Sequence, residues 1–209
     1  MYISKLQYIT PQYKDESFFD TLQQVIDADI DWVQIRVKDI PRNQWLSIAR
    51  KAVIMCQEAG VTCIINDDPL IAKESSADGV HLGKNDMTPK EARNLLGKSA
   101  IIGGTANTID DIEQLYLQDV NYIGLGPFQF TTTKENLSPI LGIEGYTDII
   151  KQCNERCIRI PIISIGGITI EDIPGIMHTG IHGIAISSFI TRASNIPKTV
   201  GEIKKQLKM

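Results

Sequence analysis

Short apolar runs alternate with amphipathic segments along nearly the whole chain. The apolar runs are rich in β-branched residues and have the length of buried strands. The predicted strands are Leu6–Thr10, Trp32–Lys38, Thr62–Asn66, Gly79–Leu82, Ala100–Gly103, Tyr122–Gly126, Ile160–Ile165 and Gly183–Ser187. Between them, hydrophobic residues recur at helical spacing. The predicted helices are Phe18–Ala28, Arg42–Ala59, Pro89–Leu96, Ile109–Leu117, Glu144–Asn154, Ile170–His178 and Pro197–Leu207.

This regular order of strand and helix predicts the fold class. Alternating strands and helices form parallel sheets, because each helix returns the chain to the start of the next strand. Eight units of roughly 26 residues favour a closed (β/α)8 barrel over an open doubly wound sheet. No low-complexity linker divides the chain. We therefore predict an α/β protein whose residues 1–209 form a single TIM-barrel domain.

Composition excludes several classes of partner. The formal net charge is −4, from 21 Lys and Arg against 25 Asp and Glu, so no overall positive field recruits nucleic acid or anionic membrane. The first residues resemble neither a signal peptide nor a transit helix, and no apolar run approaches the roughly 20 residues that span a bilayer. We expect a cytoplasmic protein whose four cysteines are reduced thiols. Any anion site must come from a local cluster.

Such a cluster lies within the second predicted strand. Alternation places Gln34, Arg36 and Lys38 on one face and apolar residues on the other. In a barrel strand the polar face points inward, and burying two cations there is costly unless a negative charge compensates. An anionic ligand is the favoured partner of these cations, and an internal salt bridge is the alternative.

Carboxylates follow the third and fourth predicted strands. Asp67 comes directly after Asn66, and Asp86 follows the fourth strand. Neighbouring strands lie about 4.8 Å apart, so these two carboxylates can share one ion. Mg²⁺ prefers a few carboxylates together with phosphate and water. The alternative is helix capping, with Asp67 or Asp68 capping a helix at Pro69 and Asp86 capping the next one.

A second candidate anion site lies at the last two strands. Gly166 and Gly167 close the seventh strand, and Ser187 and Ser188 close the eighth. Glycine lets backbone N–H groups approach an anion, and loops after strands seven and eight are the usual phosphate site of these barrels. The alternative is that the two glycines only make a tight turn.

The connection after the sixth strand carries hydroxyls beside a cation. It reads GPFQFTTTKENLSP from Gly126 to Pro139, and it follows a buried apolar run. Thr131, Thr133 and Lys134 suit phosphate oxygens as well as solvent. Because this loop opens at the carboxyl end of the barrel, where barrel enzymes place their chemistry, we expect it to bind phosphate.

These segments together resemble the thiamine-phosphate synthase family. The shared motifs are QIRVKD, NDD, ADGVHLGKND, YIGLGPFQFTTTK, ISIGGI and GIAISS, in order from about Leu6 to about Ile190. The resemblance implies a (β/α)8 barrel that joins 4-amino-2-methyl-5-hydroxymethylpyrimidine diphosphate to 4-methyl-5-(2-phosphoethyl)thiazole or its carboxylated form. It also implies Mg²⁺, release of pyrophosphate, and a pyrimidine cation with no protein nucleophile.

The resemblance also implies a role for each candidate residue. The pyrimidine diphosphate is expected at Gln34, Arg36, Lys38 and Lys134, with help from Asn66. Asp67 and Asp86 are expected to hold Mg²⁺. The thiazole phosphate is expected at Thr131, Thr133, Gly167, Ser187 and Ser188. Arg36, Lys38, Thr105 and Lys134 form the expected catalytic set. Beyond the two substrates, a homodimer is the only partner considered.

Three positions depart from the family's pattern. Thr105 stands where serine is common, Asn107 where histidine is common, and Lys84 where glutamine is common. Two other functions on this fold are alternatives. A thiazole tautomerase-like enzyme needs a base, which is expected to be a histidine at position 107. A non-catalytic sensor of thiamine precursors would not need Asp67 and Asp86 together.

Overall fold

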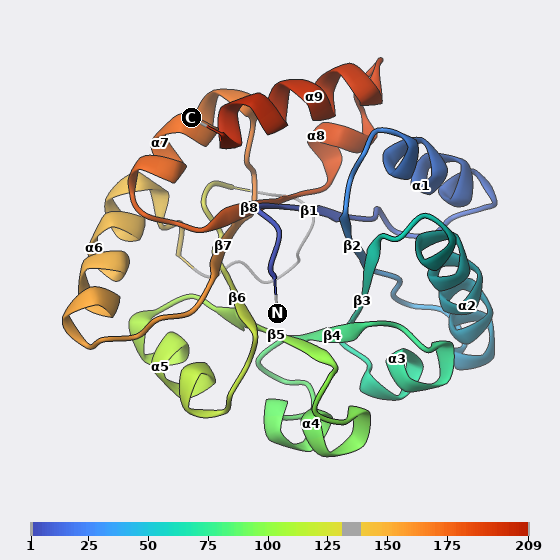
Figure 1. Cartoon of the computed structure of the whole chain (residues 1–209), viewed down its shortest axis with the longest axis horizontal. Helices are drawn as coiled ribbons and strands as arrows, with labels where there is room; N and C mark the ends of the chain where they lie inside the picture. The colour runs from blue at the N-terminus through green and yellow to red at the C-terminus, as the bar shows by residue number, and fades with distance from the viewer. Residues whose placement is uncertain (1, 131–138, 209) are drawn as a thin grey trace.

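Eight parallel strands close into a barrel. The computed structural model describes residues 2–130 and 139–208, and Figure 1 looks along the barrel axis. Each strand pairs with the next, and β1 also pairs with β8 through Leu6 and Ile184. The prediction of a (β/α)8 barrel is thereby confirmed. The strands are β1 (Leu6–Ile9), β2 (Trp32–Ile35), β3 (Thr62–Asn66), β4 (Gly79–Leu82), β5 (Ile101–Ala106), β6 (Tyr122–Leu125), β7 (Ile162–Ile165) and β8 (Gly183–Ile186).

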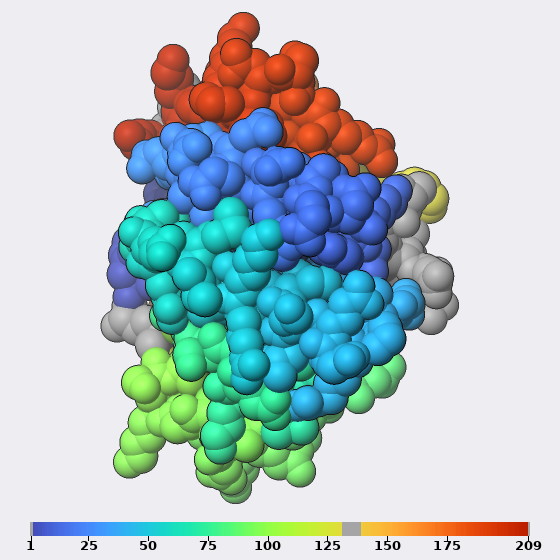
Figure 2. Space-filling model, turned by 90° about the vertical axis from the view of Figure 1, so that its right-hand side faces the viewer, coloured from blue at the N-terminus to red at the C-terminus, as the bar shows by residue number. Residues whose placement is uncertain are grey.

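Helices form a ring around these strands (Figure 1). Figure 2 shows helices from the first part of the chain packed side by side on one flank, with α9 bordering α1. No helix in the described ranges is long and apolar enough to cross a membrane. The helices are α1 (Ser17–Asp27), α2 (Arg42–Glu58), α3 (Pro69–Ser75), α4 (Pro89–Leu96), α5 (Ile109–Leu117), α6 (Gly142–Glu155), η1 (Ile170–Asp172), α7 (Ile173–His178), α8 (Ser188–Thr191) and α9 (Ile196–Leu207).

Two strands end three residues away from the predicted position, whereas the other strand limits differ from the prediction by two residues at most. β2 ends at Ile35 rather than Lys38, because the Arg36 N–H leaves the strand ladder and donates to Thr10 Oγ1 at 2.9 Å. β5 runs to Ala106 rather than Gly103. Its two glycines are required by close packing, since a Cβ at Gly103 would lie 2.2 Å from the Tyr122 ring. Glycine here marks a crowded strand and not the end of one.

The core has two compartments, inside the barrel and between the barrel and its helices. The inner compartment contains Ile3, Trp32, Ile64, Tyr122 and Ile163, among others. A much larger apolar cluster joins the outer faces of the strands to the helices. The four cysteines are free thiols, as predicted, and all but one are buried.

Candidate active site

Asp67 and Asp86 meet at the carboxyl ends of β3 and β4. Asp67 has a left-handed backbone with φ of 66°, and its N–H donates to the His81 carbonyl at 2.8 Å. Asp86 Oδ2 accepts the Gly83 N–H at 2.6 Å. The two carboxylates flank Gly83, because a Cβ built there would lie 3.0 Å from Asp86 Oδ2 and 4.0 Å from Asp67 Oδ1. The carboxylate pair predicted from two separate motifs is therefore brought together.

The electrostatics of this pair favour a cation. Burial raises the pKa of Asp86 above its usual value, and the neighbouring Asp67 raises it further. The Gly83 N–H and the Lys38 ammonium oppose that rise. Two carboxylates this close repel each other when both are ionised, and a divalent ion between them removes the repulsion.

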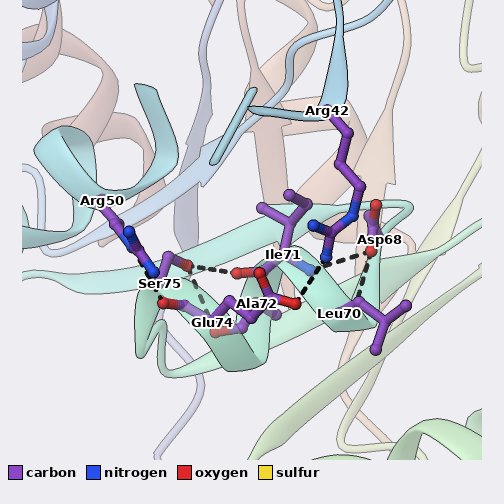
Figure 3. A network of polar contacts seen from close by, with 8 residues as sticks. All are labelled: Arg42, Arg50, Asp68, Leu70, Ile71, Ala72, Glu74 and Ser75. Carbon is purple, nitrogen blue, oxygen red and sulfur yellow. Dashed lines mark hydrogen bonds and ion pairs between the residues drawn. The ribbon is translucent and has the colours of Figure 1, made fainter. Parts of the chain in front are cut away.

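Other residues carry out the helix capping that was the alternative role for these carboxylates. Figure 3 shows Asp68 at the start of α3, where Oδ1 accepts the N–H groups of Leu70 and Ile71 at 2.9 and 3.0 Å. Thr88 caps α4 in a capping box with Glu91. Asp67 and Asp86 are thus spared from capping. The described residues contain no cluster of three His, Cys, Asp or Glu able to hold a metal, and two carboxylates suit Mg²⁺, which keeps several waters and takes phosphate oxygens.

Lys38 faces the same carboxylates. Its Nζ lies 3.1 Å from Asp67 Oδ2, and the two side chains are 46% and 34% exposed. The internal salt bridge weighed against an anion site is therefore present. A pair this exposed is held weakly because water screens it, so an incoming diphosphate and metal can replace it. Arg36, which directly follows β2 two residues before Lys38, is half-buried.

The uncharged candidates lie deeper in the barrel. Gln34 is buried and donates to Gln7 Oε1 at 3.2 Å, and Asn66 is buried at the end of β3. Thr105 is half-buried, and its Oγ1 lies 3.0 Å from His81 Nε2. These three side chains come from β2, β3 and β5. The charged candidates follow the carboxyl ends of β2, β3 and β4.

At the second anion site, the two glycines make a close-packed turn. Gly166 and Gly167 have φ of 101° and 72°, where side chains are strained. A Cβ at Gly167 would lie 2.7 Å from the Phe130 carbonyl oxygen. The turn is also pinned by the Gln129 N–H, which donates to the Gly166 carbonyl at 2.9 Å. The tight-turn explanation is thus supported, and phosphate contact by Gly167 stays a prediction.

The hydroxyls expected at this site are only partly described. Ser187 is the N-cap residue of α8 and Ser188 its first residue, and Ser188 is exposed. Thr131, Thr133 and Lys134 lie outside the described residues. The chain on either side of them is anchored at the end of β6, because the Leu141 N–H donates to Pro127 O and the Gly142 N–H to Phe128 O, both at 3.0 Å.

The departures from the family's pattern have structural partners. Lys84 Nζ lies 2.6 Å from Asp111 Oδ2, and the Asn107 side chain donates to the Gly126 carbonyl. Lys84 and Asp111 line a cavity of about 260 Å³ that Asp86 and Thr105 also border. The first contact joins the loop after β4 to α5, and the second joins the loop after β5 to the end of β6.

Sequence reasoning missed three residues behind this site. His81 contacts Thr105 and Tyr122, and Gln7 contacts Tyr122 and Gln34. The available signal was a polar residue at an inward position of an otherwise apolar strand. Gln7 in LQYI and His81 in GVHL both have that pattern.

Comparison with known proteins identifies the family. The sequence profile described as thiamine monophosphate synthase matches residues 6–190. The chain belongs to this family. It is 49% identical over 191 residues to the thiamine-phosphate synthase of Phocaeicola vulgatus, covering 91% of this chain and 92% of that protein. It is 46% identical over 204 residues to that of Flavobacterium psychrophilum, covering 98% and 99%.

Solved structures agree on the fold. The thiamine phosphate pyrophosphorylase from Pyrococcus furiosus superposes with a TM-score of 0.83 at 24% identity, covering 98% of this chain and 95% of that one. At that identity the likeness supports the (β/α)8 barrel alone. Function follows instead from the family and its close relatives: the chain is a transferase of the thiamine-phosphate synthase family.

Proposed function

We propose that this enzyme joins 4-amino-2-methyl-5-hydroxymethylpyrimidine diphosphate to 4-methyl-5-(2-phosphoethyl)thiazole, giving thiamine phosphate and pyrophosphate. With the carboxylated form of the thiazole, the ring carboxylate also leaves as carbon dioxide. The observation that carries the proposal is the meeting of Asp67, Asp86 and Lys38 at the carboxyl ends of neighbouring strands. Two carboxylates and a lysine can bind a diphosphate together with a divalent ion.

The proposed reaction needs no protein nucleophile. The bond from the methylene carbon to the diphosphate oxygen breaks, and its electron pair leaves with the oxygen. The aminopyrimidine ring delocalises the positive charge, and the thiazole nitrogen lone pair then forms the new C–N bond. Arg36, Lys38 and Lys134 are proposed to stabilise the leaving charge, so catalysis consists of placement and electrostatics.

Asp67 and Asp86 are the proposed ligands of Mg²⁺, which when bound supplies positive charge for the leaving diphosphate. Gln34, Asn66 and Thr105 are proposed to orient the pyrimidine. Thr131, Thr133, Gly167, Ser187 and Ser188 are proposed to hold the thiazole phosphate. A cytoplasmic location and a homodimer belong to the same proposal, and light scattering of the purified protein tests the dimer.

One assay separates this proposal from the alternatives. Purified protein is incubated with both substrates and Mg²⁺, and thiamine phosphate is measured directly, with Asp67→Asn as the control variant. We expect product that requires both substrates and disappears in the control. Proton exchange on the thiazole without condensation would instead indicate a tautomerase, and binding of both precursors without turnover would indicate a sensor.

A further inference from the structure

Five polar side chains form a continuous hydrogen-bonded chain inside the barrel. Thr105 Oγ1 lies 3.0 Å from His81 Nε2, and His81 Nδ1 lies 3.0 Å from Tyr122 Oη. Gln7 Nε2 donates to Tyr122 Oη at 3.3 Å, and Gln34 Nε2 donates to Gln7 Oε1 at 3.2 Å. This set of side chains, called the relay below, links Gln34 on β2 to Thr105 on β5.

The barrel is shaped around this relay. Gln7, Gln34, His81 and Tyr122 are at most 7% exposed, whereas Thr105 is only half-buried. Two inward-facing glycines leave room for the imidazole. A Cβ at Gly103 would lie 2.6 Å from His81 Nδ1, and one at Gly124 would lie 3.1 Å from His81 Cε1. The relay therefore runs from the closed interior to a hydroxyl that a ligand can reach.

The glutamine side-chain amides determine which group donates at each hydrogen bond of the relay. Tyr122 Oη accepts a hydrogen bond from Gln7 Nε2, an amide nitrogen that can only donate. The Tyr122 hydroxyl hydrogen therefore has His81 Nδ1 as its acceptor. A neutral imidazole that accepts at Nδ1 carries its hydrogen on Nε2. That hydrogen points at Thr105 Oγ1, which accepts it and directs its own hydroxyl hydrogen elsewhere.

We propose that the relay fixes Thr105 as a hydrogen-bond donor at the barrel mouth. His81 and Tyr122 act as positioning residues, and through them the Thr105 hydroxyl selects a pyrimidine whose ring nitrogen accepts this hydrogen bond. The inference rests on the proposed function, in which Thr105 contacts this ring. A pyrimidinone ring carries N–H at that position, so its hydrogen-bond donor faces the Thr105 hydroxyl, which is also a donor. The enzyme discriminates against it because neither group is then satisfied.

The tautomer of His81 tests the relay directly. The chain has three histidines, so ¹⁵N-histidine labelling gives few signals, and His81→Asn assigns the one of interest. Long-range ¹H–¹⁵N spectra of the ligand-free enzyme are expected to show His81 with its hydrogen on Nε2. A hydrogen on Nδ1, or on both nitrogens, overturns the proposal.

Tyr122→Phe removes the hydroxyl that sets the tautomer and keeps the ring. We expect the His81 signals to shift toward the Nδ1–H form and KM for the pyrimidine diphosphate to rise about 10-fold, with KM for the thiazole phosphate unchanged. Tyr146→Phe is the matched control, because Tyr146 is equally buried but bonds Ser164 and the Leu125 carbonyl. An unchanged tautomer and KM in Tyr122→Phe contradict the proposal.

A second pair of variants keeps the test independent of Tyr122. Thr105→Val removes the donor and is expected to lose discrimination between the aminopyrimidine and pyrimidinone diphosphates, about 10-fold or more. Thr105→Ser retains the hydroxyl and is expected to retain discrimination. Equal discrimination in Thr105→Val and wild type contradicts the relay. The histidine spectra do not require the enzyme to turn over substrate. Failure to form thiamine phosphate would therefore refute the proposed function, whereas the tautomer of His81 would still test the relay.

Discussion

Asp86 illustrates how one residue can oppose folding and serve binding. Its pKa in the folded protein is raised, first by burial and then by Asp67. A raised carboxyl pKa means that the fold favours the protonated form, so the stability it contributes is present below the unfolded pKa and is lost as pH rises through the folded pKa. At neutral pH the ionised Asp86 therefore destabilises the metal-free protein.

Asp86→Asn should consequently stabilise the metal-free fold while abolishing metal binding. We expect the free energy of unfolding in urea with chelator at pH 7 to rise by about 0.5 kcal/mol, a small value because solvent screens a half-buried carboxylate. The gain should shrink as pH falls toward about 4. Calorimetry should detect little Mg²⁺ binding. Asp68→Asn is the matched control, since asparagine caps a helix as well as aspartate does. Normal Mg²⁺ affinity in Asp86→Asn would refute the ligand assignment.

Lys38 is proposed to favour binding of the pyrimidine diphosphate and to oppose binding of Mg²⁺ alone. In the free enzyme it pairs with Asp67, whereas in the complex it is proposed to bind diphosphate. Lys38→Met should weaken pyrimidine diphosphate binding by about 10-fold or more, yet strengthen binding of Mg²⁺ alone by up to about fivefold, the worth of an exposed pair. Calorimetry measures both. Lys98→Met, at an exposed lysine between α4 and β5, should change neither. Weaker binding of Mg²⁺ alone would contradict this model of competition for Asp67.

Ser188→Ala tests whether the second anion site is separate from the first. The exposed hydroxyl of Ser188 begins α8, and backbone N–H groups at the same turn are expected to carry much of any phosphate contact. We therefore expect a loss of less than about 10-fold in thiazole phosphate affinity. Pyrimidine diphosphate affinity should not change. Both affinities are measured separately by calorimetry, and an effect confined to the pyrimidine diphosphate would mean that the two sites are reversed.

At the scale of the element, β5 packs against its neighbours only because Gly103 has no side chain. Gly103→Ala places a Cβ 2.2 Å from the Tyr122 ring, so the barrel must shift or unfold. We expect a loss of about 3 kcal/mol or more in chemical denaturation, at the upper end for overpacking. Gly201→Ala is the control, because a Cβ there meets nothing within 4 Å and alanine favours a helix interior. It should stabilise α9 by about 0.5–1 kcal/mol. Equal stability of the two variants would contradict the packing argument.

The ends of a helix or strand could be predicted where residues close in sequence set them, and could not where a contact from another element does. The predictions for Pro89–Leu96 and Ile109–Leu117 are confirmed residue for residue. In both helices a threonine capping box fixes the first turn. β2 was predicted three residues too long because its end depends on Thr10, the residue that follows β1. The end of β5 was predicted at Gly103 because the side chains that its glycines accommodate, Tyr122 of β6 and Leu115 of α5, belong to other elements.

The site shows the same division. Asp67 and Asp86 could be predicted because parallel strands bring their carboxyl ends together, whatever the details of packing. The sequence does not predict which aspartate caps α3, because Asp67 and Asp68 are adjacent. Only the left-handed backbone at Asp67, with φ of 66°, turns the two side chains in different directions. The Lys38–Asp67 contact and the interior relay join residues from different strands. Such contacts follow from barrel register, which the strand pattern alone does not set.

At the scale of the whole molecule, barrel closure places the two candidate anion sites across one mouth. Asp67 and Asp86 follow β3 and β4, whereas the glycine turn and the serines follow β7 and β8, half a barrel away. Closure between β1 and β8 fixes this separation. Ligands at the two sites should therefore stabilise the fold independently, and only the first should depend on a metal.

Thermal unfolding with simple anions measures that independence. Pyrophosphate with Mg²⁺ at about 100 times its Kd should add about 2.7 kcal/mol, raising the melting temperature by about 5–10 °C. Pyrophosphate with chelator should do much less. Inorganic phosphate, acting at the β7–β8 side, should stabilise equally with or without Mg²⁺. Asp67→Asn, which tolerates the left-handed backbone, should remove the metal-dependent shift and leave the phosphate shift intact. A pyrophosphate shift that survives chelation would mean that the diphosphate binds through cationic side chains alone, without the carboxylate pair.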